Sequence, residues 1–203
     1  ATTEIYTLSL HDALPICLDD YPSTANFHES PDYVEYTDDI YVGYRYFETL
    51  KGAKEKVNYP FGYGLSYTEF SIEPIWSGEK DGTIYVTAEI TNTGAFPGKE
   101  VVQLYYGAPQ GLLGKPARVL GAFEKTKELK PGETETLVLT LPTAAMASYD
   151  DLGKVQKSAY VLEKGEYHFY LGNSVRDAGL LDFVWTLDED QVTLQLTEKM
   201  APS

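Results

Sequence analysis

Cysteine, cationic residues and long apolar runs are all scarce in this sequence of 203 residues. The single cysteine, Cys17, can form neither an internal disulfide framework nor a cysteine-based zinc site. No apolar run reaches the roughly 18 residues that a membrane-spanning helix needs, so we expect no membrane partner. Lysine and arginine number 16 against 31 aspartate and glutamate residues, which gives a net charge of −15. We expect no nucleic-acid partner, because this charge would repel the phosphate backbone.

Apolar and aromatic residues are plentiful. The chain is 43% hydrophobic and 23% charged, a composition typical of folded rather than disordered proteins. Its length favours one globular domain together with part of a second. The 17 tyrosines indicate large buried areas in which the phenol groups need hydrogen-bond partners.

The first sixteen residues, ATTEIYTLSLHDALPI, resemble residue for residue the translation of a widely used sequencing adapter. Such a segment has to be set aside before the fold is interpreted. We therefore expect residues 1–16 to be an artefact, and His11 with Asp12 to be no catalytic dyad. The alternative is a genuine amphipathic N-terminal arm. If the segment is an artefact, the coding sequence began upstream and the chain is a fragment.

The next part of the chain is a polar, proline-punctuated stretch over residues 17–31, which predicts a loop. Eleven aromatic residues then lie between Tyr33 and Phe70. In residues 59–67 (YPFGYGLSY) the aromatic residues share one parity, and proline, glycine and serine share the other. An extended backbone there would have one ring-covered face and one bare face that can approach another element. Residues 40–47 fit either a short strand or a helical turn.

From Thr68 onward the pattern is that of β-strands. Ile84, Val86, Ala88 and Ile90 alternate with polar residues after the hairpin signal Asp81-Gly82. Further apolar runs lie at residues 100–106, 137–141, 167–171, 181–187 and 192–196, after turn signals. Seven or so short strands without a long helical period predict a mainly β fold, an antiparallel sandwich.

Several motifs carry a family resemblance. Residues 34–47 (VEYTDDIYVGYRYF) and 59–67 resemble the end of the second domain of glycoside hydrolase family 3 enzymes, which are mostly β-glucosidases. The motifs that follow resemble the fibronectin type III-like domain of that family: NTG at 92–94, GKEVVQLY at 98–105, LGAFE at 120–124, LKPGET at 129–134, KGEY at 164–167 and LGNS at 171–174. The match runs from about Cys17 to at least Ser174. One departure is Asp38-Asp39, where many members have Glu-Gly, which suggests a subgroup.

The resemblance implies a domain organisation. Residues 1–16 are the artefact, 17–66 a C-terminal remnant of the α/β-sandwich second domain, and 67–196 an immunoglobulin-like, fibronectin type III-like domain. Residues 197–203 form a tail or the start of a linker. Some members carry the catalytic barrel after this domain, so residues 192–203 could lead into one. Whether the barrel precedes or follows this segment stays open.

The resemblance also implies a chemistry, retaining hydrolysis of glycosides by two carboxyl groups. In the family the aspartate nucleophile lies on the barrel in a Ser-Asp-Trp-like stretch, and the glutamate acid/base lies earlier in the second domain. This sequence has no Ser-Asp pair, and Ser148-Tyr149-Asp150 is the nearest approach. We therefore expect no catalytic residue here, no metal and no cofactor, while substrate-binding residues stay undefined. The fragment is expected to be inactive, with carbohydrate as substrate of the full enzyme and the missing parts of the parent chain as partners.

Several polar residues allow a functional and a structural interpretation. The acidic groups Asp38-Asp39, Asp150-Asp151 and Asp188–Asp190 could bind calcium, but their spacing fits no calcium loop and favours solvated turns. His28 and His168 could be ligands or acid/base groups, but both are isolated, and His168 has the parity of a strand's polar face.

Arg45, Trp76, Trp185, Gly62 and Gly64 also have two interpretations. Arg45 could touch a sugar hydroxyl, but more often such an arginine stacks on rings or pairs a carboxylate across a domain seam. The tryptophans could stack on sugars, although in a sandwich the core is favoured. The glycines could approach a ligand, or serve packing at the domain junction.

The rival function is a non-catalytic carbohydrate-binding or surface-adhesion module, since sandwich folds host many functions. The motifs between Tyr36 and Tyr67 favour the enzyme, because an adhesion repeat does not need them. We also expect Tyr33–Tyr67 to expose apolar surface, because its neighbours in the parent are absent.

Overall fold

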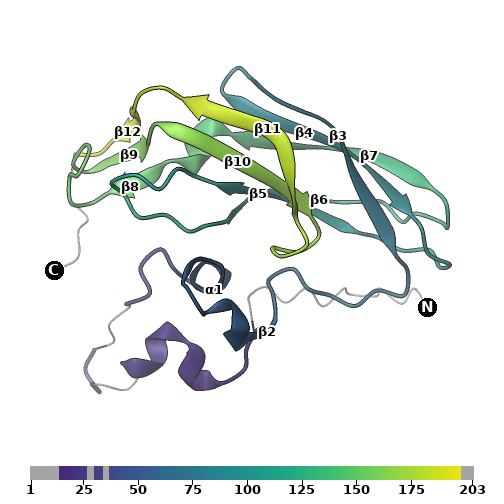
Figure 1. The fold of residues 1–203 in the computed structure, drawn as a ribbon, viewed down its shortest axis with the longest axis horizontal. Coiled ribbons are helices and arrows are strands. Elements are labelled where there is room, and N and C mark those ends of the chain that lie inside the picture. Colours follow the sequence, from purple (N-terminus) through teal and green to yellow (C-terminus); the bar gives the residue numbers. More distant parts are fainter. Residues whose placement is uncertain (1–13, 27–29, 34–36, 198–203) are drawn as a thin grey trace.

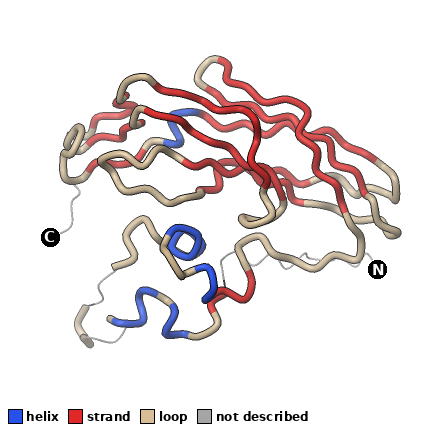
Figure 2. The backbone as a smooth tube through the Cα atoms, viewed as in Figure 1, coloured by secondary structure: helices blue, strands red, loops and turns tan. Residues whose placement is uncertain are grey.

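The computed structural model describes residues 14–26, 30–33 and 37–197. Two β-sheets face each other in a sandwich (Figures 1 and 2). One sheet holds three strands in the spatial order β3 (Phe70–Lys80), β4 (Thr83–Asn92) and β7 (Thr134–Pro142). The other holds four, in the order β11 (Gly179–Leu187), β10 (Gly165–Gly172), β5 (Val101–Gly107) and β6 (Val119–Lys125). Every pairing is antiparallel, so the predicted sandwich is confirmed.

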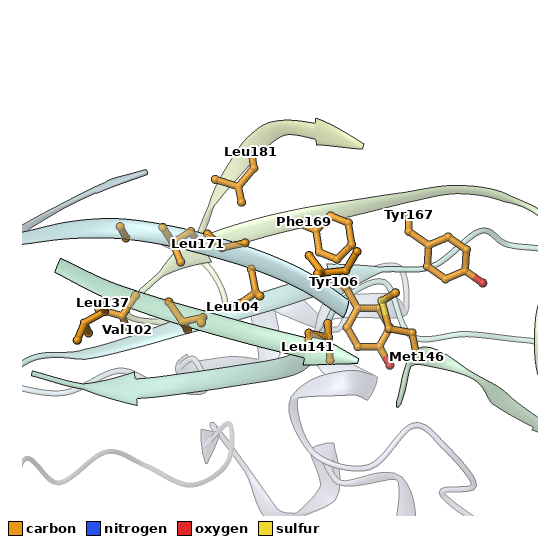
Figure 3. Close-up of a cluster of buried hydrophobic side chains, with 14 of the residues drawn as sticks. Val102, Leu104, Tyr106, Leu137, Leu141, Met146, Tyr167, Phe169, Leu171 and Leu181 are labelled. Atoms are coloured by element: carbon orange, nitrogen blue, oxygen red, sulfur yellow. The ribbon is translucent and has the colours of Figure 1, made fainter. Parts of the chain in front are cut away.

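The core between the two sheets follows from the period-two pattern of the strands. Ile84, Val86, Ala88 and Ile90 of β4 are fully buried. They face apolar residues of β5 and β10, among them Leu104 and Phe169 (Figure 3). Each buried aliphatic or aromatic side chain of this size stabilises the fold by roughly 1.5–3 kcal/mol. The buried Tyr167 places its hydroxyl 2.9 Å from the Glu163 carbonyl oxygen, to which it donates.

A third, small sheet lies at one end of the sandwich and was not predicted. Its strands occur in the order β12 (Gln191–Gln195), β9 (Ala159–Leu162) and β8 (Ser148–Asp150), and the 3₁₀ turn η4 (Thr143–Met146) precedes β8. The strands β8 and β9 are only three and four residues long, so their alternation is too short to be recognised in the sequence.

The segment before the sandwich is a separate small unit. Its elements are β1 (Leu14–Pro15), the 3₁₀ turns η1 (Leu18–Asp20) and η2 (Pro22–Ala25), α1 (Tyr44–Thr49), the 3₁₀ turn η3 (Lys54–Lys56) and β2 (Val57–Tyr59). Strand β1 pairs with β2. The choice left open for residues 40–47 is settled by α1, which starts at Tyr44.

Residues 59–67 are not extended throughout, so the ring-covered face that an extended backbone would have does not form over the whole stretch. The backbone is extended only up to Tyr59, and the Tyr63 amide donates to the Pro60 carbonyl oxygen at 3.0 Å. Gly62, with φ of 85°, lies in the turn so formed. The turn breaks the alternation after Tyr59.

Some predictions fall on residues outside the described ranges. These residues are His11, Asp12, His28, the first three residues of the motif at 34–47, and 198–203. Within the part of the chain that is described, no helix is long and apolar enough to cross a membrane.

Candidate functional site: the seam between the N-terminal segment and the sandwich

The N-terminal segment packs on the outer face of the four-stranded sheet, beneath β5 and β10 in Figure 1. Tyr44 and Phe47 of α1 form a second small core there with Tyr105 of β5. The Tyr44 ring stacks on Phe61 at a centroid distance of 4.5 Å and meets Tyr105 edge-on at 6.3 Å. Aromatic pairs of this geometry stabilise beyond their buried area by about 0.5–1.5 kcal/mol. We call this contact between residues 37–66 and the sandwich the seam.

An ion-pair network crosses the seam at Glu48. The carboxylate of Glu48 has a side-chain exposure of 2%, and the Arg176 guanidinium donates to it at 2.8 Å. Lys54 pairs with the other carboxylate oxygen at 3.1 Å. Arg176 also donates to the Lys54 carbonyl oxygen at 3.0 Å. A buried carboxylate needs such partners, because desolvation without them costs several kcal/mol.

Backbone groups also bond across the seam. The Leu120 amide donates to the Tyr44 hydroxyl oxygen at 2.9 Å, and the Ala117 amide donates to the Thr49 hydroxyl at 2.8 Å. The Val175 amide donates to the Phe61 carbonyl oxygen at 3.0 Å. The N-terminal segment is therefore bonded to two separate stretches of the sandwich, residues 117–120 and the loop after β10.

At Gly62 the backbone of the N-terminal segment lies too close to the sandwich to leave room for a side chain. A Cβ at this position would lie 2.9 Å from both the Asn173 carbonyl oxygen and the Gln103 side-chain nitrogen. Those two atoms are hydrogen-bonded to each other at 2.8 Å. Gln103 in turn accepts a hydrogen bond from the hydroxyl of Tyr105, whose pKa burial raises well above its usual value. The packing interpretation of Gly62 is confirmed, and that of Gly64 stays a prediction.

Several large apolar residues of the N-terminal segment and of the connection to β3 are open to solvent. They include Val42 at 57%, Leu65 at 79% and Tyr67 at 75% exposure. Tyr33 and Tyr59 are exposed as well. The expectation that Tyr33–Tyr67 exposes apolar surface is confirmed.

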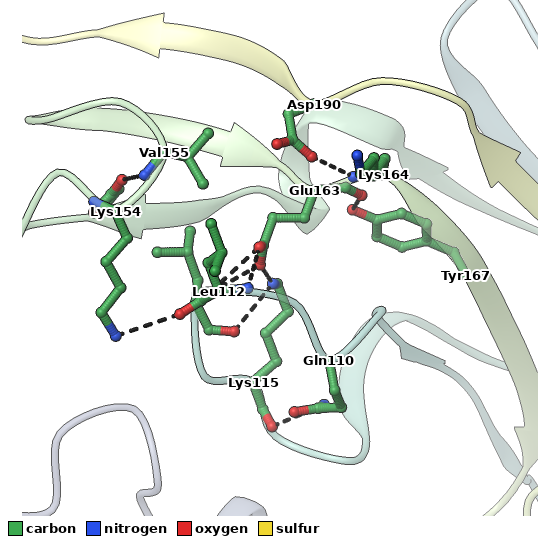
Figure 4. Close-up of polar contacts among 11 residues, drawn as sticks. Gln110, Leu112, Lys115, Lys154, Val155, Glu163, Lys164, Tyr167 and Asp190 are labelled. Atoms are coloured by element: carbon green, nitrogen blue, oxygen red, sulfur yellow. Dashed lines mark hydrogen bonds and ion pairs between the residues drawn. The ribbon is translucent and has the colours of Figure 1, made fainter.

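A buried carboxylate, Glu163, holds the loop between β5 and β6 (Figure 4). It accepts a hydrogen bond from the Leu112 amide at 2.6 Å and forms an ion pair with Lys115, and both charged side chains are almost fully buried. The same loop ends at Ala117, which bonds to α1. The carboxylate thus fixes a loop that reaches the seam.

Asp150 corrects the expectation that Asp150-Asp151 is a solvated turn. Asp150 is fully buried, and it accepts hydrogen bonds from the amides of residues 153–156 at 2.7–3.0 Å. Burial alone would raise its pKa, but the four donors together hold that pKa below the usual value. The carboxylate organises the loop after β8 and is unavailable for chemistry with a ligand.

The other acidic groups lie in turns. Asp38 is partly exposed and Asp39 is exposed, and Asp39 has φ of 51°, in the left-handed region that glycine favours. Asp190 accepts a hydrogen bond from the Lys164 amide at 2.8 Å. Over the described ranges, no three histidine, cysteine or acidic residues are grouped to hold a metal ion.

Two arginines take the roles expected of Arg45. Arg118 lies over the Tyr170 ring at 4.1 Å and donates to the Val175 carbonyl oxygen, and Arg176 pairs with Glu48. Arg45 itself makes no ion pair or ring stack with the described residues. Burial raises the pKa of the Tyr106 phenol, and Arg45 partly opposes that rise. The interactions expected of Arg45 are thus made by Arg118 and Arg176, and the role of Arg45 itself stays a prediction.

The two tryptophans differ. Trp185 packs against the core, 5.0 Å from the Tyr167 ring, as expected. Trp76 is 54% exposed, so its assignment to the core is wrong. A β-bulge between Pro74 and Trp76 reverses the parity of β3 and turns the indole outward. His168 lies on the outer, partly exposed side of β10, 3.5 Å from a Glu166 carboxylate oxygen, as its parity predicted.

The NTG motif at residues 92–94 has a structural role, because its asparagine is buried and hydrogen-bonded. Asn92 of the NTG motif is fully buried, donates to the Phe96 and Leu129 carbonyl oxygens at 2.8 Å, and accepts from Thr68 at 2.7 Å.

The side chains that sequence reasoning missed are Glu48, Lys115, Arg118, Glu163 and Arg176. Their pairings join residues as far as 128 positions apart, and one sequence carries no signal for such a pairing.

Four carboxyl groups of the described residues are bonded to the protein itself. Glu48, Asp150 and Glu163 are buried and bonded to the protein itself. Burial raises the pKa of Glu100, and this carboxyl accepts hydrogen bonds from the Val101 amide at 2.8 Å and the Asn173 side chain at 3.3 Å. The absence of catalytic residues from this chain stays a prediction.

Comparison with known proteins defines the class first. Residues 100–175 match the fibronectin type III-like domain, which agrees with the seven-stranded sandwich. β-Glucosidase A of Butyrivibrio fibrisolvens is 54% identical over 96% of this chain. Crystal structures of a Paenibacillus barengoltzii β-glucosidase (52% identity, 93% of the chain, TM-score 0.88) and of the Bifidobacterium adolescentis family 3 β-glucosidase (33%, 87%, 0.75) are also similar.

The chain is therefore homologous to a segment of glycoside hydrolase family 3 β-glucosidases, one that includes their fibronectin type III-like domain, as the motifs indicated. It spans only a fifth to a quarter of the length of these relatives: 25%, 21% and 25%. The match to the Butyrivibrio enzyme covers so much of the chain that it includes part of residues 1–16. The artefact interpretation of those residues stays a prediction, as do the domain boundaries.

Proposed function

We propose that this chain is the bracing part of a retaining, exo-acting β-glucosidase and has no hydrolytic activity of its own. In this proposal the sandwich holds the end of the second domain in place, so that catalytic groups on parts beyond this chain stay aligned. A misplacement of about 1 Å at such groups can lower the rate a hundredfold, so a rigid brace matters.

The observation that carries the proposal is that the N-terminal segment is packed firmly on the sandwich and still exposes large apolar residues. The Tyr44 ring, the Glu48 ion pairs and the close approach at Gly62 attach it to the sandwich. Val42, Leu65 and Tyr67 stay exposed, although a self-contained unit would bury most such side chains. A segment built in this way links one structural unit to another. Carbohydrate is the substrate of the full enzyme in this proposal, as the names of the relatives suggest.

The activity test uses the purified chain and a nitrophenyl β-glucoside. We expect no saturable release of nitrophenol above a matched blank. Saturable release that co-purifies with the chain, and that is lost on heating it above its unfolding temperature, would overturn the proposal. The variant Glu100→Gln then tests a carboxyl whose pKa burial raises, and we expect it to equal the native chain in this assay.

A further inference from the structure

The outer face of the sheet β3-β4-β7 carries an exposed indole that lies on bare backbone. The bulge in β3 turns Trp76 outward. A Cβ at Gly78 would lie 2.6 Å from Cζ2 and 2.9 Å from Cη2 of that indole. The ring therefore occupies the space that a side chain at position 78 would fill, and 54% of Trp76 is exposed to solvent. The result is a ring laid along the strand with one face open.

The register places hydroxyl-bearing residues beside this ring. Trp76 is opposite Thr87 on β4, and Thr87 is opposite Val138 on β7. Gly78 is opposite Tyr85 in the same way. Val86, which lies between Tyr85 and Thr87 on β4, points into the core. Tyr85 and Thr87 therefore share the outer face with the indole. This face combines two aromatic residues with hydroxyl groups.

Two carboxylates lie in the neighbouring row of the same face. Glu73 and Glu89 are directly opposite each other in the ladder, and both are exposed. Like charges in that arrangement destabilise a sheet. Neither forms an ion pair with another described residue. Glu89 is two residues from Thr87 on β4, and this spacing is about 7 Å along a strand. A ligand that covers the Trp76 ring can therefore reach the carboxylate oxygens of Glu73 and Glu89.

We propose that this outer face is a binding surface for a neutral glycan chain. A pyranose ring would stack its C–H face on Trp76, and its hydroxyl groups would donate to the carboxylates of Glu73 and Glu89 and to Thr87. The two carboxylates, in a chain of net charge −15, repel an anionic polymer and suit a ligand that brings only hydroxyl donors. The outward residues lie along β3, which is an edge strand, and along β4 beside it, so an extended chain that follows the strands fits this face.

The position of the surface allows it to act together with the brace. The N-terminal segment packs on the other sheet, so the seam and the indole lie on opposite sides of the sandwich (Figure 1). The surface goes beyond the bracing function and does not depend on it. It would hold a polymer near an enzyme that acts on chain ends.

The test is affinity electrophoresis of the whole chain in native gels that contain barley β-glucan or, as an anionic comparison, polygalacturonate. We expect β-glucan to retard the native chain and polygalacturonate to have no effect. Trp76→Ala should weaken the interaction about tenfold, the value of one aromatic contact. Gly78→Ala keeps the indole but lifts it from the strand, and should weaken the interaction as well. Phe123→Ala, which removes an exposed aromatic residue of the other sheet, should leave retardation unchanged.

Tryptophan fluorescence gives a second readout. Trp185 is in the core, so a change in emission on adding β-glucan should come from Trp76 and should vanish in Trp76→Phe. Native chain that β-glucan does not retard would overturn the proposal. So would equal retardation of the native chain and of Gly78→Ala, a variant that leaves the core untouched even if Trp76→Ala folds poorly. Stronger retardation by polygalacturonate than by β-glucan would also contradict it.

Discussion

At the residue scale, the polar groups that matter most in this chain are buried carboxylates with several partners each. Glu48 has Lys54 and Arg176, Glu163 has Lys115 and backbone amides, and Asp150 has four backbone amides. The sequence shows these residues only as acids among many. Their role depends on which partners the fold brings to them, and so it could not be predicted from residue type.

Asp150→Asn should lower the free energy of unfolding by about 3 kcal/mol at neutral pH, because the amide can accept fewer of the four hydrogen bonds and presents a donor to the others. The folded-state pKa lies below the usual value of 3.8, so the ionised carboxylate stabilises the fold above that value and loses this contribution as pH falls through the folded pKa. Urea denaturation at a series of pH values measures both effects.

The matched control for this substitution is Asp151→Asn, at the neighbouring and partly exposed position. We expect it to change stability by less than about 0.5 kcal/mol. An Asp150→Asn chain as stable as the native one at neutral pH, or one whose stability falls just as steeply in acid, would contradict the assigned role.

Gly62→Ala should destabilise the chain by about 2–4 kcal/mol, because the new Cβ meets backbone oxygen at 2.9 Å and φ is 85°. Gly52→Ala separates the effect of the positive φ from the effect of the Cβ contact. Gly52 has φ of 79° in the same segment, but nothing lies within 4 Å of its Cβ position. We expect it to cost only about 1 kcal/mol. Thermal unfolding of the two variants measures the difference, and equal costs would contradict the close packing at Gly62.

At the element scale, the fold was predictable wherever alternation persisted. The pattern at residues 84–90 predicted β4 because its apolar residues are all on the core side. Strand β3 shows where this reasoning fails. Trp76 was expected in the core because the tryptophans of a sandwich usually are, but the bulge between Pro74 and Trp76 shifts the register by one residue and turns the indole outward. A bulge has no clear signal in a single sequence, so the outward orientation of Trp76 could not be predicted.

The sequence predicted where along the chain the seam lies, but not the contacts that form it. Its aromatic residues and Gly62 stood out in the sequence, whereas the attachment of α1 to the loop after β10 did not. That attachment depends on Glu48 and Arg176, which are brought together only when the two units dock.

Arg176→Ala should loosen α1 without unfolding the sandwich, because it removes the closest partner of a carboxylate that has a side-chain exposure of 2%. We expect the amides of residues 44–49 to exchange with deuterium about tenfold faster, while those of β4 and β5 keep their protection. Lys54→Ala removes a partner that is 57% exposed and should have a smaller effect, since exposed ion pairs contribute little. Uniform loss of protection across both units would contradict a local role for this pair.

At the scale of the whole molecule, the chain consists of a sandwich and a small N-terminal unit attached to it. The sandwich has a closed core, and its packing accounts for the buried Asn92 of the NTG motif. The attached unit has a small core against the sandwich and several exposed apolar residues. Fold class, family and the exposure of the region Tyr33–Tyr67 followed from the sequence because they depend on local patterns. The contacts that hold the unit to the sandwich needed the structure, because they join residues far apart in the sequence.

The most direct test of the bracing account is static light scattering of the native chain and of the double variant Leu65→Glu/Tyr67→Glu, over a range of concentrations. The variant places charge on the exposed side of the N-terminal segment and leaves the seam intact. The account predicts that the native chain associates beyond the monomer mass and binds an apolar dye, while the variant stays monomeric and binds little dye. A native chain that remains monomeric at every concentration, with no dye bound at this segment, would contradict it.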